Sequence, residues 1–425
     1  MSRKINFIVL SILVVFCAFT ATGYQELSTQ IDKADTAWML VSSAFVLLMT
    51  PGLSFFYGGM INKKNVISTM LQSFVALGVI SVLWVIIGFS LAFGESLGGI
   101  IGNPLTYLNF KNVGIEPNPD FAPTIPFLLY ALFQLKFAII TPALITGSFA
   151  GRIRFRSYIL FMVLFSLLIY SPLAHMTWHP EGLFRKWGVL DFAGGTVVHM
   201  SAGFAALAGA IYLGKRKIEI GEHANVPHVI LGTGLLWFGW FGFNAGSALG
   251  VNGDAVIAFA NTNIASATAM ITWLFYERML GRKMSAIGAC IGAVVGLVAI
   301  TPAAGFVNIG QSVLIGFIAS IISNWMIHLQ HKSGIDDTLD VFPSHGIGGI
   351  VGMLLTGILA SKVGLIYGET TTFYAHLIAL LITAIFTFGG SYILFKVVDI
   401  LLRMRVRPDQ EERGLDLSQH GEQLE

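Results

Sequence analysis

The sequence predicts an all-α membrane protein that crosses the bilayer many times. Of its 425 residues, 55% are hydrophobic and only 11% are charged, and the mean hydropathy is +0.75. Soluble domains carry about 25% charged residues, so this composition is typical of a polytopic membrane protein. Apolar runs of about 20 residues, the length that a spanning helix needs, recur along the chain. The 47 glycines agree with this class, because small residues let helix backbones approach closely in lipid.

Residues 1–23 have the pattern of a cleaved signal peptide. Arg3 and Lys4 precede a short apolar run over 5–19, and small residues follow at 21–23, where cleavage is expected. The alternative is a retained additional helix, but the run is slightly too short to span a bilayer. We therefore expect the mature chain to begin near residue 24.

Eleven further apolar segments predict eleven transmembrane helices within residues 24–403. The last of these helices covers about 371–403, and residues 404–425 form a polar regulatory tail. The eleven segments are centred near Val46, Gly78, Ala138, Phe165, Ala205, Trp237, Met270, Gly292, Ile318, Val351 and Ile385.

The distribution of basic residues predicts the orientation of the chain. Lysine and arginine gather in alternate connections, such as 63–64, 152–156, 215–217 and 278–283, and in the tail, whereas the intervening connections hold fewer. By the positive-inside rule, the richer side faces the cytoplasm. The mature N-terminus is then outside and the C-terminus inside, in agreement with an odd number of crossings. We expect a multi-pass protein of the cell (inner) membrane.

Two groups of five helices, over about 36–213 and 226–361, are expected to form an inverted repeat. Five crossings in each half would give the halves opposite orientations, and such repeats place the transport site at their interface. A weak echo supports the repeat: Gly-Gly-x-x-x-His ends at His199, and His-Gly-x-Gly-Gly begins at His345. The alternative is that glycine-rich helices simply look alike.

His199 and His345 lie inside apolar segments of membrane length. Ionisable groups at that depth are costly and usually face a protein-lined path. A neutral imidazole can donate from one nitrogen and accept at the other, so a hydrogen-bonded pair could line an apolar pore. The alternative is a buried histidine bonded to a backbone carbonyl. Hydropathy places the two at different depths, so contact between them would require a broken or re-entrant start to the tenth helix.

An aromatic cluster is expected at the external face. Phe133, Trp178 and Ser247 lie near the outer ends of three helices, and aromatic faces with a hydroxyl can hold a small cation. Phe137 and Phe243 each lie four residues from an outer partner, one helical turn deeper, where they could close a pore. The alternatives are an interfacial belt tryptophan and ordinary core phenylalanines.

Charged residues near this cluster have separate interpretations. Asp191 lies just before a predicted helix, where a carboxylate can cap free N–H groups or raise the local cation concentration; capping is the simpler role. Lys136 lies between the outer and inner phenylalanines, and we expect its side chain to point away from the pore, because a buried unpaired ammonium is costly. Asp336, Asp337 and Asp340 are interpreted as solvated charges of a cytoplasmic connection.

Several ordered stretches together carry a resemblance to the ammonium transporter (Amt) branch of the Amt/Rh family. The resemblance covers essentially the whole mature chain, and the combination of stretches makes it specific. The stretches are 51–59, Phe133-Gln134 with Phe137-Ala138, 191–199, 239–247, and Asp340 through His345-Gly346.

The resemblance implies a homotrimer in which each subunit has its own pore. It implies an outer recruitment site of Phe133, Trp178 and Ser247, a stacked gate of Phe137 and Phe243, a twin-histidine pair of His199 and His345, and Asp191 as a recruitment or architectural residue. The tail over 404–425 resembles the family's cytoplasmic tail, where PII-type signalling proteins dock together with the inner connections.

These observations predict an ammonium transporter rather than an enzyme. We expect ammonium to be recruited outside, deprotonated and conducted as ammonia through the bilayer, with separate proton transfer. The alternatives are a passive ammonia or carbon dioxide channel, and a sensor that acts mainly by sequestering a PII protein. The sequence contains no Ser–His nucleophile motif and no metal-ligand spacing such as His-Glu-x-x-His, so no cofactor or metal is expected. The net charge of +2 gives no indication of nucleic-acid binding.

Overall fold

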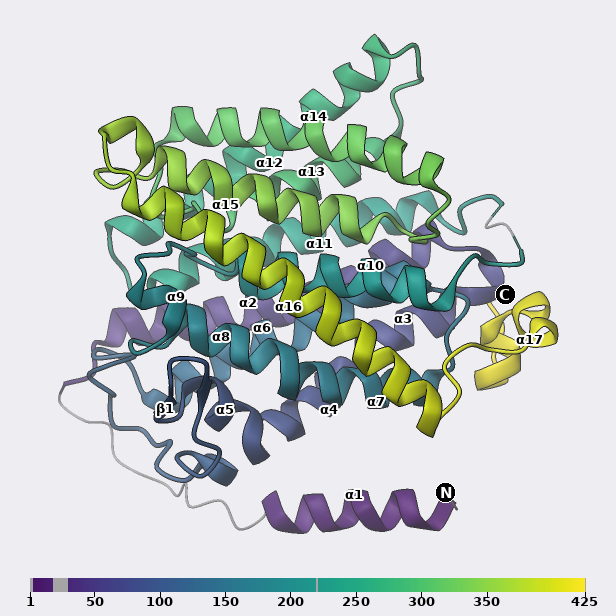
Figure 1. The fold of residues 1–425 in the computed structure, drawn as a ribbon, viewed down its shortest axis with the longest axis horizontal. Coiled ribbons are helices and arrows are strands. Elements are labelled where there is room, and N and C mark those ends of the chain that lie inside the picture. The colour runs from purple at the N-terminus through teal and green to yellow at the C-terminus, as the bar shows by residue number, and fades with distance from the viewer. Residues whose placement is uncertain (1–2, 18–29, 219–220, 425) are drawn as a thin grey trace.

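Long helices that run side by side make up most of the structure (Figure 1). The computed structural model describes residues 3–17, 30–218 and 221–424. Within these ranges, ten helices are long and apolar enough to cross a membrane. The predicted helical, polytopic membrane fold is therefore confirmed.

The first half of the bundle runs from residue 33 to residue 213 and includes a short two-stranded hairpin. Its main elements are α2 (Lys33–Met60), α3 (Val66–Phe74), α4 (Ala76–Leu83), α5 (Phe89–Phe93), β1 (Ser96–Leu97), β2 (Ile101–Gly102), α6 (Phe127–Ile145), α7 (Phe155–Phe165), α8 (Ser171–Trp178), α9 (Leu183–Lys186) and α10 (Ser201–Leu213).

The second half begins after residue 225 and ends in the tail. Its main elements are α11 (Val226–Ala245), α12 (Gly253–Met279), α13 (Ala286–Ile300), α14 (Ile309–Ser333), α15 (Gly348–Leu359), α16 (Thr371–Leu401) and, in the tail, α17 (Pro408–Arg413) with the π-helical turn η10 (Asp416–His420).

Ten of the eleven predicted helix centres lie in the ten long apolar helices. The remaining centre, Gly292, lies in α13, which has only 15 residues. Protein covers α13 along most of its length, since α12 and α14 both pack on it and most of its residues are buried. A helix enclosed by protein need not match the hydrocarbon thickness that lipid-facing helices span. An eleventh crossing stays a prediction, as do the inverted repeat and the orientation.

π-helical turns lie in four of the spans, two of them within the span and two at its start. Such turns are rare and frequently lie at functional sites. Two of them carry the histidines: His199 lies in η6, which leads into α10, and His345 lies in η8, which leads into α15. The four turns are η2 (Trp84–Gly88), η5 (Ser166–Tyr170), η6 (Gly195–Met200) and η8 (Phe342–Ile347).

The helix α10 crosses η8 with almost no space between the two backbones. A Cβ atom on Gly203 would lie 2.2 Å from the backbone nitrogen of Gly346. Glycine at this crossing therefore lets the two segments touch, as small residues do elsewhere in membrane bundles. Gly203 is one helical turn from His199, and Gly346 follows His345, so this contact brings the histidines to one depth.

We call one end of the bundle the basic end, because it carries the lysine- and arginine-rich connections and the tail, at the right of Figure 1. The tail folds back onto this end. Ile153 forms a β-bridge with Arg405, and the Asp416 carboxylate accepts hydrogen bonds from the N–H groups of Ile67 (3.0 Å) and Ser68 (2.7 Å) at the start of α3. The tail is thus packed against two connections.

The N-terminal helix α1 (Arg3–Cys17) lies at the edge of the molecule (Figure 1). Its apolar side chains are largely exposed, for example Phe7 at 71% and Ile12 at 62%. Asn109 holds its end by donating a hydrogen bond of 2.8 Å to the Phe16 carbonyl. The predicted cleavage site at 21–23 lies outside the described residues, so the signal peptide stays a prediction.

Candidate functional site

A cavity of about 550 Å³ opens at the end of the bundle opposite the basic end. We call it the vestibule. Four of the residues that the sequence singled out line it: Phe137 on α6, Trp178 at the end of α8, Asp191 before η6, and Ser247 after α11. The fold therefore brings residues from four separate segments to one hollow.

Phe133 lies behind the vestibule rather than on its surface. Its side chain is 1% exposed, and its ring packs edge-on against Phe137 at a centroid distance of 5.0 Å. Gln134, the next residue, lines the vestibule instead, and its Oε1 accepts no hydrogen bond from the described residues. Gln134 was not predicted as a vestibule residue, because the prediction rested on the aromatic side chains of Phe133 and Phe137.

The rings of Phe137 and Phe243 close the bottom of the vestibule. Their centroids are 4.3 Å apart with an interplanar angle of 38°, and both side chains are buried. Trp178 meets Phe137 edge-on at 5.7 Å, so an aromatic wall leads from the vestibule to the two phenylalanines. The two rings form a closed apolar layer at this point.

The two histidines lie directly beyond this layer. The Nδ1 atoms of His199 and His345 are 3.3 Å apart, and their rings are nearly parallel at a centroid distance of 5.4 Å. The His199 ring lies 5.9 Å from Phe243 and stacks on Trp240 at 5.3 Å. A hydrogen bond between two Nδ1 atoms requires one donor and one acceptor, so at least one imidazole of the pair is neutral. His199 Nε2 has no hydrogen-bond partner among the described residues.

Trp240 is a second residue of the site that was not predicted from the sequence. It is 1% exposed, and its Nε1 donates a hydrogen bond of 2.9 Å to Thr301 Oγ1. That bond fixes the indole plane parallel to His199, with an interplanar angle of 15°. A tryptophan three residues before Phe243 on a helix shares its face, which is the signal that could have identified it.

Asp191 caps the start of η6. Its carboxylate accepts hydrogen bonds from the N–H groups of Gly194 (2.8 Å), Gly195 (2.6 Å) and Thr196 (2.8 Å), and from the Thr196 hydroxyl (2.6 Å). Its backbone carbonyl accepts from Trp178 Nε1 at 3.2 Å. Asp191 therefore ties the start of the His199 segment to the vestibule tryptophan, while its charge also lies at the vestibule wall.

Lys136 is not among the residues that line the vestibule. It is partly buried on the same face of α6 as Leu128 and Leu132, which lie eight and four residues before it. Among the residues that the structure describes, its ammonium group has no ion-pair or hydrogen-bond partner. Its position agrees with a side chain that points away from the pore.

Two aspartates of the connection before η8, Asp336 and Asp337, are not solvated charges, contrary to the sequence interpretation; Asp340 is partly exposed and contacts His331 at 2.9 Å. Asp336 pairs with Arg152 at 2.7 Å and with Arg216. Although burial raises the pKa of Asp336, the hydrogen bond from Arg216 and the charge of Arg152 hold it below its usual value. Asp337 is buried and accepts a hydrogen bond of 2.7 Å from the Phe342 N–H at the start of η8. The hydropathy of a short connection does not reveal such internal partners.

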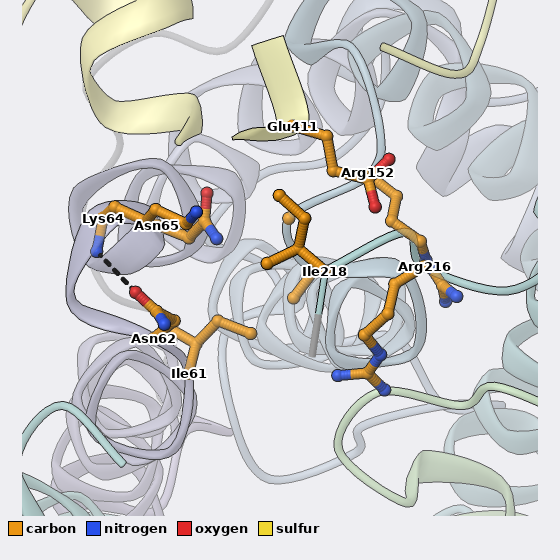
Figure 2. Close-up of a pocket in the computed structure, with 10 residues that line it drawn as sticks. Ile61, Asn62, Lys64, Asn65, Arg152, Arg216, Ile218 and Glu411 are labelled. Carbon is orange, nitrogen blue, oxygen red and sulfur yellow. Dashed lines mark hydrogen bonds between the residues drawn. The ribbon is translucent and has the colours of Figure 1, made fainter. Parts of the chain in front are cut away.

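A small pocket at the basic end joins the tail to these charged residues (Figure 2). Glu411 of α17 lines it together with Arg152 and Arg216, and Asn62 accepts a hydrogen bond of 3.2 Å from the Lys64 N–H. Burial lowers the pKa of Arg152 to about 10, against the opposing effect of Asp336. The guanidinium therefore stays protonated near neutral pH.

The fold and the site together define a class: a polytopic helical membrane transporter whose aromatic vestibule leads to a buried histidine pair. A model of the Ammonium Transporter Family matches residues 37–424. The chain belongs to this family; it is an ammonium transporter and not an enzyme. The resemblance stated from the sequence is therefore confirmed.

Individual relatives align with this chain over nearly their whole lengths. The ammonium transporter of Aquifex aeolicus is 44% identical and is covered over 97% of its length by 96% of this chain. That of Bacillus subtilis is also 44% identical, with 98% of its length and 92% of this chain covered. Among solved structures, Saccharomyces cerevisiae Mep2 matches with a TM-score of 0.85 at 34% identity, over 92% of this chain and 93% of that chain.

Proposed function

We propose that this transporter takes up ammonium by binding the cation in the vestibule, removing its proton near the phenylalanine pair and passing ammonia along the two histidines. The observation that carries the proposal is the 3.3 Å distance between His199 Nδ1 and His345 Nδ1, beyond an aromatic barrier. The proton follows a separate path, so that net uptake is electrogenic.

Recruitment depends on ring faces and one hydroxyl oxygen. Ser247 Oγ donates its proton to the Phe243 carbonyl at 2.8 Å, so the lone pairs of that oxygen are left to accept from an ammonium N–H. Trp178 Nε1 is engaged by Asp191, which leaves the indole face for cation–π attraction. Phe133 contributes from behind, by holding the Phe137 ring.

Selectivity follows from the chemistry of the cation. Transfer of an ion from water into an apolar passage carries a large desolvation cost, which potassium cannot avoid because it has no neutral form. Ammonium can lose a proton and enter as ammonia. The histidine pair then offers a neutral molecule both a donor and an acceptor within an apolar passage.

The proposed topology, orientation and oligomeric state rest on the family resemblance and on the distribution of lysine and arginine. We propose eleven crossings with α13 as the eighth, the basic end in the cytoplasm of the cell (inner) membrane, and a homotrimer with one pore in each subunit. The concentration of lysine and arginine at the basic end supports this orientation. The tail and the connections beside it, which already contact one another, are the proposed docking surface for a PII-type protein.

A sensor function is the second candidate. It is favoured by a solved structure described as a sensor Amt protein, which matches with a TM-score of 0.83 at 30% identity. Capture of a PII-type protein by membranes that contain the full chain, without ammonium-driven current, would favour this candidate. A passive ammonia or carbon dioxide channel is the third, and flux that does not depend on voltage would favour it.

The test is charge displacement in liposomes that contain the purified protein. An ammonium pulse should give a sustained transient, and an equal potassium pulse should give none. The single variants His199→Leu and His345→Leu should abolish the ammonium transient or admit potassium. Unchanged selective transients in both variants would refute the histidine mechanism.

A further inference from the structure

A second cavity, of about 490 Å³, lies at the basic end and away from the pore. It is bounded by the start of α7, by the residues that follow α16, and by the tail elements α17 and η10. Among the described residues that line it, four are arginines and none is acidic. The four are Arg154, Arg156, Arg403 and Arg407. We call it the arginine cavity.

The guanidinium groups of this cavity are largely unneutralised. Arg156 and Arg403 are exposed, and within the described ranges no hydrogen bond or ion pair is found for either side chain. Arg154 uses only Nε, which donates to the Arg405 carbonyl at 3.1 Å. Arg407 is paired, with Asp409 at 3.0 Å. Like charges that share one hollow repel each other, so an anion in the cavity would relieve the repulsion.

Hydrogen bonds fix the walls of the arginine cavity. Gln419 of η10 accepts from the Phe155 N–H at 2.8 Å and donates to the Ile153 carbonyl at 3.1 Å. The Ser157 hydroxyl contacts the carbonyls of both Leu402 and Arg403 at 2.8 Å. The tail, α7 and the end of α16 are thus held together around a preformed hollow.

An apolar shelf adjoins the charged hollow. Ile400 is 77% exposed, Leu401 64% and Leu402 40%, at the end of the membrane-spanning helix α16. Arg403 follows them directly, so charge begins where the apolar surface ends. Arginine heads commonly lie at the interface while apolar side chains face the hydrocarbon. A soluble anion would use the arginines but would gain nothing from this shelf.

We propose that the arginine cavity binds the headgroup phosphate of an anionic phospholipid, with the acyl chains lying along Ile400, Leu401 and Leu402. Guanidinium groups match phosphate oxygens by paired, charge-assisted hydrogen bonds. Basic residues beside a spanning helix are also attracted to anionic lipid headgroups. The bound lipid would join α7, α16 and the tail, and so would stabilise the docked tail. The proposal rests on this cavity alone and is independent of the transport mechanism.

The experiment follows the thermal unfolding midpoint of the full chain in an uncharged detergent, because a ligand that binds the folded state raises this midpoint. Phosphatidylglycerol, phosphatidylcholine and inorganic phosphate are titrated separately. The test variant is Arg156→Gln with Arg403→Gln. The control variant is Lys283→Gln with Lys332→Gln, which removes the same charge from exposed positions outside the cavity.

Phosphatidylglycerol should raise the midpoint of the unsubstituted protein, and the test variant should require about tenfold more lipid for the same rise. The control variant should respond as the unsubstituted protein does, and Arg156→Lys with Arg403→Lys should recover part of the response. Equal responses of the test and control variants would overturn the proposal. A rise of the same size with inorganic phosphate would overturn the lipid assignment in favour of a soluble anion.

Discussion

At the scale of single residues, Ser247 illustrates how one internal hydrogen bond determines whether a side chain offers a substrate a donor or an acceptor. The hydroxyl proton is committed to the Phe243 carbonyl, so the oxygen presents acceptors only. Replacing Ser247 with Ala removes that acceptor, and a hydrogen bond to a charged group contributes about 1.5–3 kcal/mol. We expect the ammonium concentration that gives half-maximal charge displacement to rise about tenfold or more in Ser247→Ala.

The matched variant is Ser247→Thr, which keeps the hydroxyl. It should remain close to the unsubstituted protein in the same concentration series. Equal affinities in Ser247→Ala and Ser247→Thr would show that the hydroxyl does not bind ammonium.

Asp191 poses a different question at this scale, because its carboxylate both caps η6 and carries charge beside the vestibule. Asp191→Ala would leave three N–H groups and a hydroxyl without their acceptor, and we expect a loss of about 3 kcal/mol or more of stability. Asp191→Asn keeps one acceptor oxygen and removes the charge. If capping is the role, Asn should recover part of the unfolding midpoint and of the current together; recovered stability without recovered ammonium affinity would assign the role to charge.

Residue types alone predicted part of the site. An aspartate before a helix predicted the cap, and the four-residue spacings predicted that Phe137 and Phe243 lie one turn below their partners. Phe133 was expected at the vestibule surface, but Gln134 lines it instead. This could not be predicted, because it depends on how α6 is rotated about its axis, which hydropathy does not measure. Nearly every residue of α6 is buried, so the helix carries no apolar stripe to fix that rotation.

At the scale of elements, the crossing of α10 and η8 is the contact that makes the histidine pair possible. A Cβ on Gly203 would lie 2.2 and 2.3 Å from backbone atoms of Gly346, which cannot move aside as a flexible side chain could. We expect Gly203→Ala to separate the two segments, to cost about 1–3 kcal/mol in stability and to abolish selective ammonium current. Thermal unfolding and liposome currents would measure the two effects.

Gly234→Ala on α11 is the matched control, since nothing lies within 4 Å of the position of its Cβ. It should leave both the unfolding midpoint and the current unchanged. Normal current in Gly203→Ala would contradict the prediction, because it would show that the histidine pair functions when α10 and η8 lie further apart.

Asp337, in the connection that leads into η8, is a pH-dependent group. Burial, with a smaller contribution from the charge of Asp340, raises the pKa of Asp337 to about 6. Between the ordinary pKa of aspartate, near 4, and this value, the folded state holds more protons than the unfolded state, so stability falls as pH rises. We expect a loss of about 3 kcal/mol across that window and no further loss from this group above it.

Unfolding midpoints measured between pH 4 and 8 would test this prediction. Asp337→Asn, which cannot ionise but keeps an oxygen for the Phe342 N–H, should remove this part of the pH dependence. An unchanged pH profile in that variant would assign the dependence to other groups.

Hydropathy predicted the helices well and the depth of the histidines poorly. It treats each span as a uniform rod, whereas His199 and His345 lie in π-helical turns at the starts of α10 and α15. A π-helical turn shifts the register of the residues that follow it, and no composition signal marks where one begins. Glycine at 203 and 346 was the available clue, but the chain holds 47 glycines, and only the three-dimensional crossing distinguishes these two.

At the scale of the whole molecule, composition alone was sufficient for the fold class. The apolar fraction excluded a soluble domain, and ten of the eleven predicted centres lie in helices that can span a membrane. The sequence did not predict that α13 would be short, because hydropathy does not report whether protein or lipid covers a helix. It also did not predict that the tail would be packed, since a polar segment of that length is equally compatible with a free tail.

The packed tail gives a prediction for the molecule as a unit. Arg405 Nη2 donates to the Lys215 carbonyl (2.7 Å) and contacts Glu411 (3.2 Å), while the Leu415 N–H donates to Asn65 (2.8 Å). The tail thus ties a connection of the first half to the segment that joins the two halves, yet the core clusters lie almost wholly within the helix bundle. Truncation after Arg403 should therefore leave a folded transporter with a lower unfolding midpoint.

That truncated protein should also lose capture of a PII-type protein, because the proposed docking surface needs the tail and the connections together. Pull-down from membranes with a purified PII-type protein measures capture, and Asp416→Ala is the milder comparison. This variant releases only the end of the tail from α3, by removing the acceptor for the Ile67 and Ser68 N–H groups, and should weaken capture less than truncation does. Undiminished capture by the truncated chain would place the docking surface on the connections alone, and the tail would then serve only to stabilise the fold.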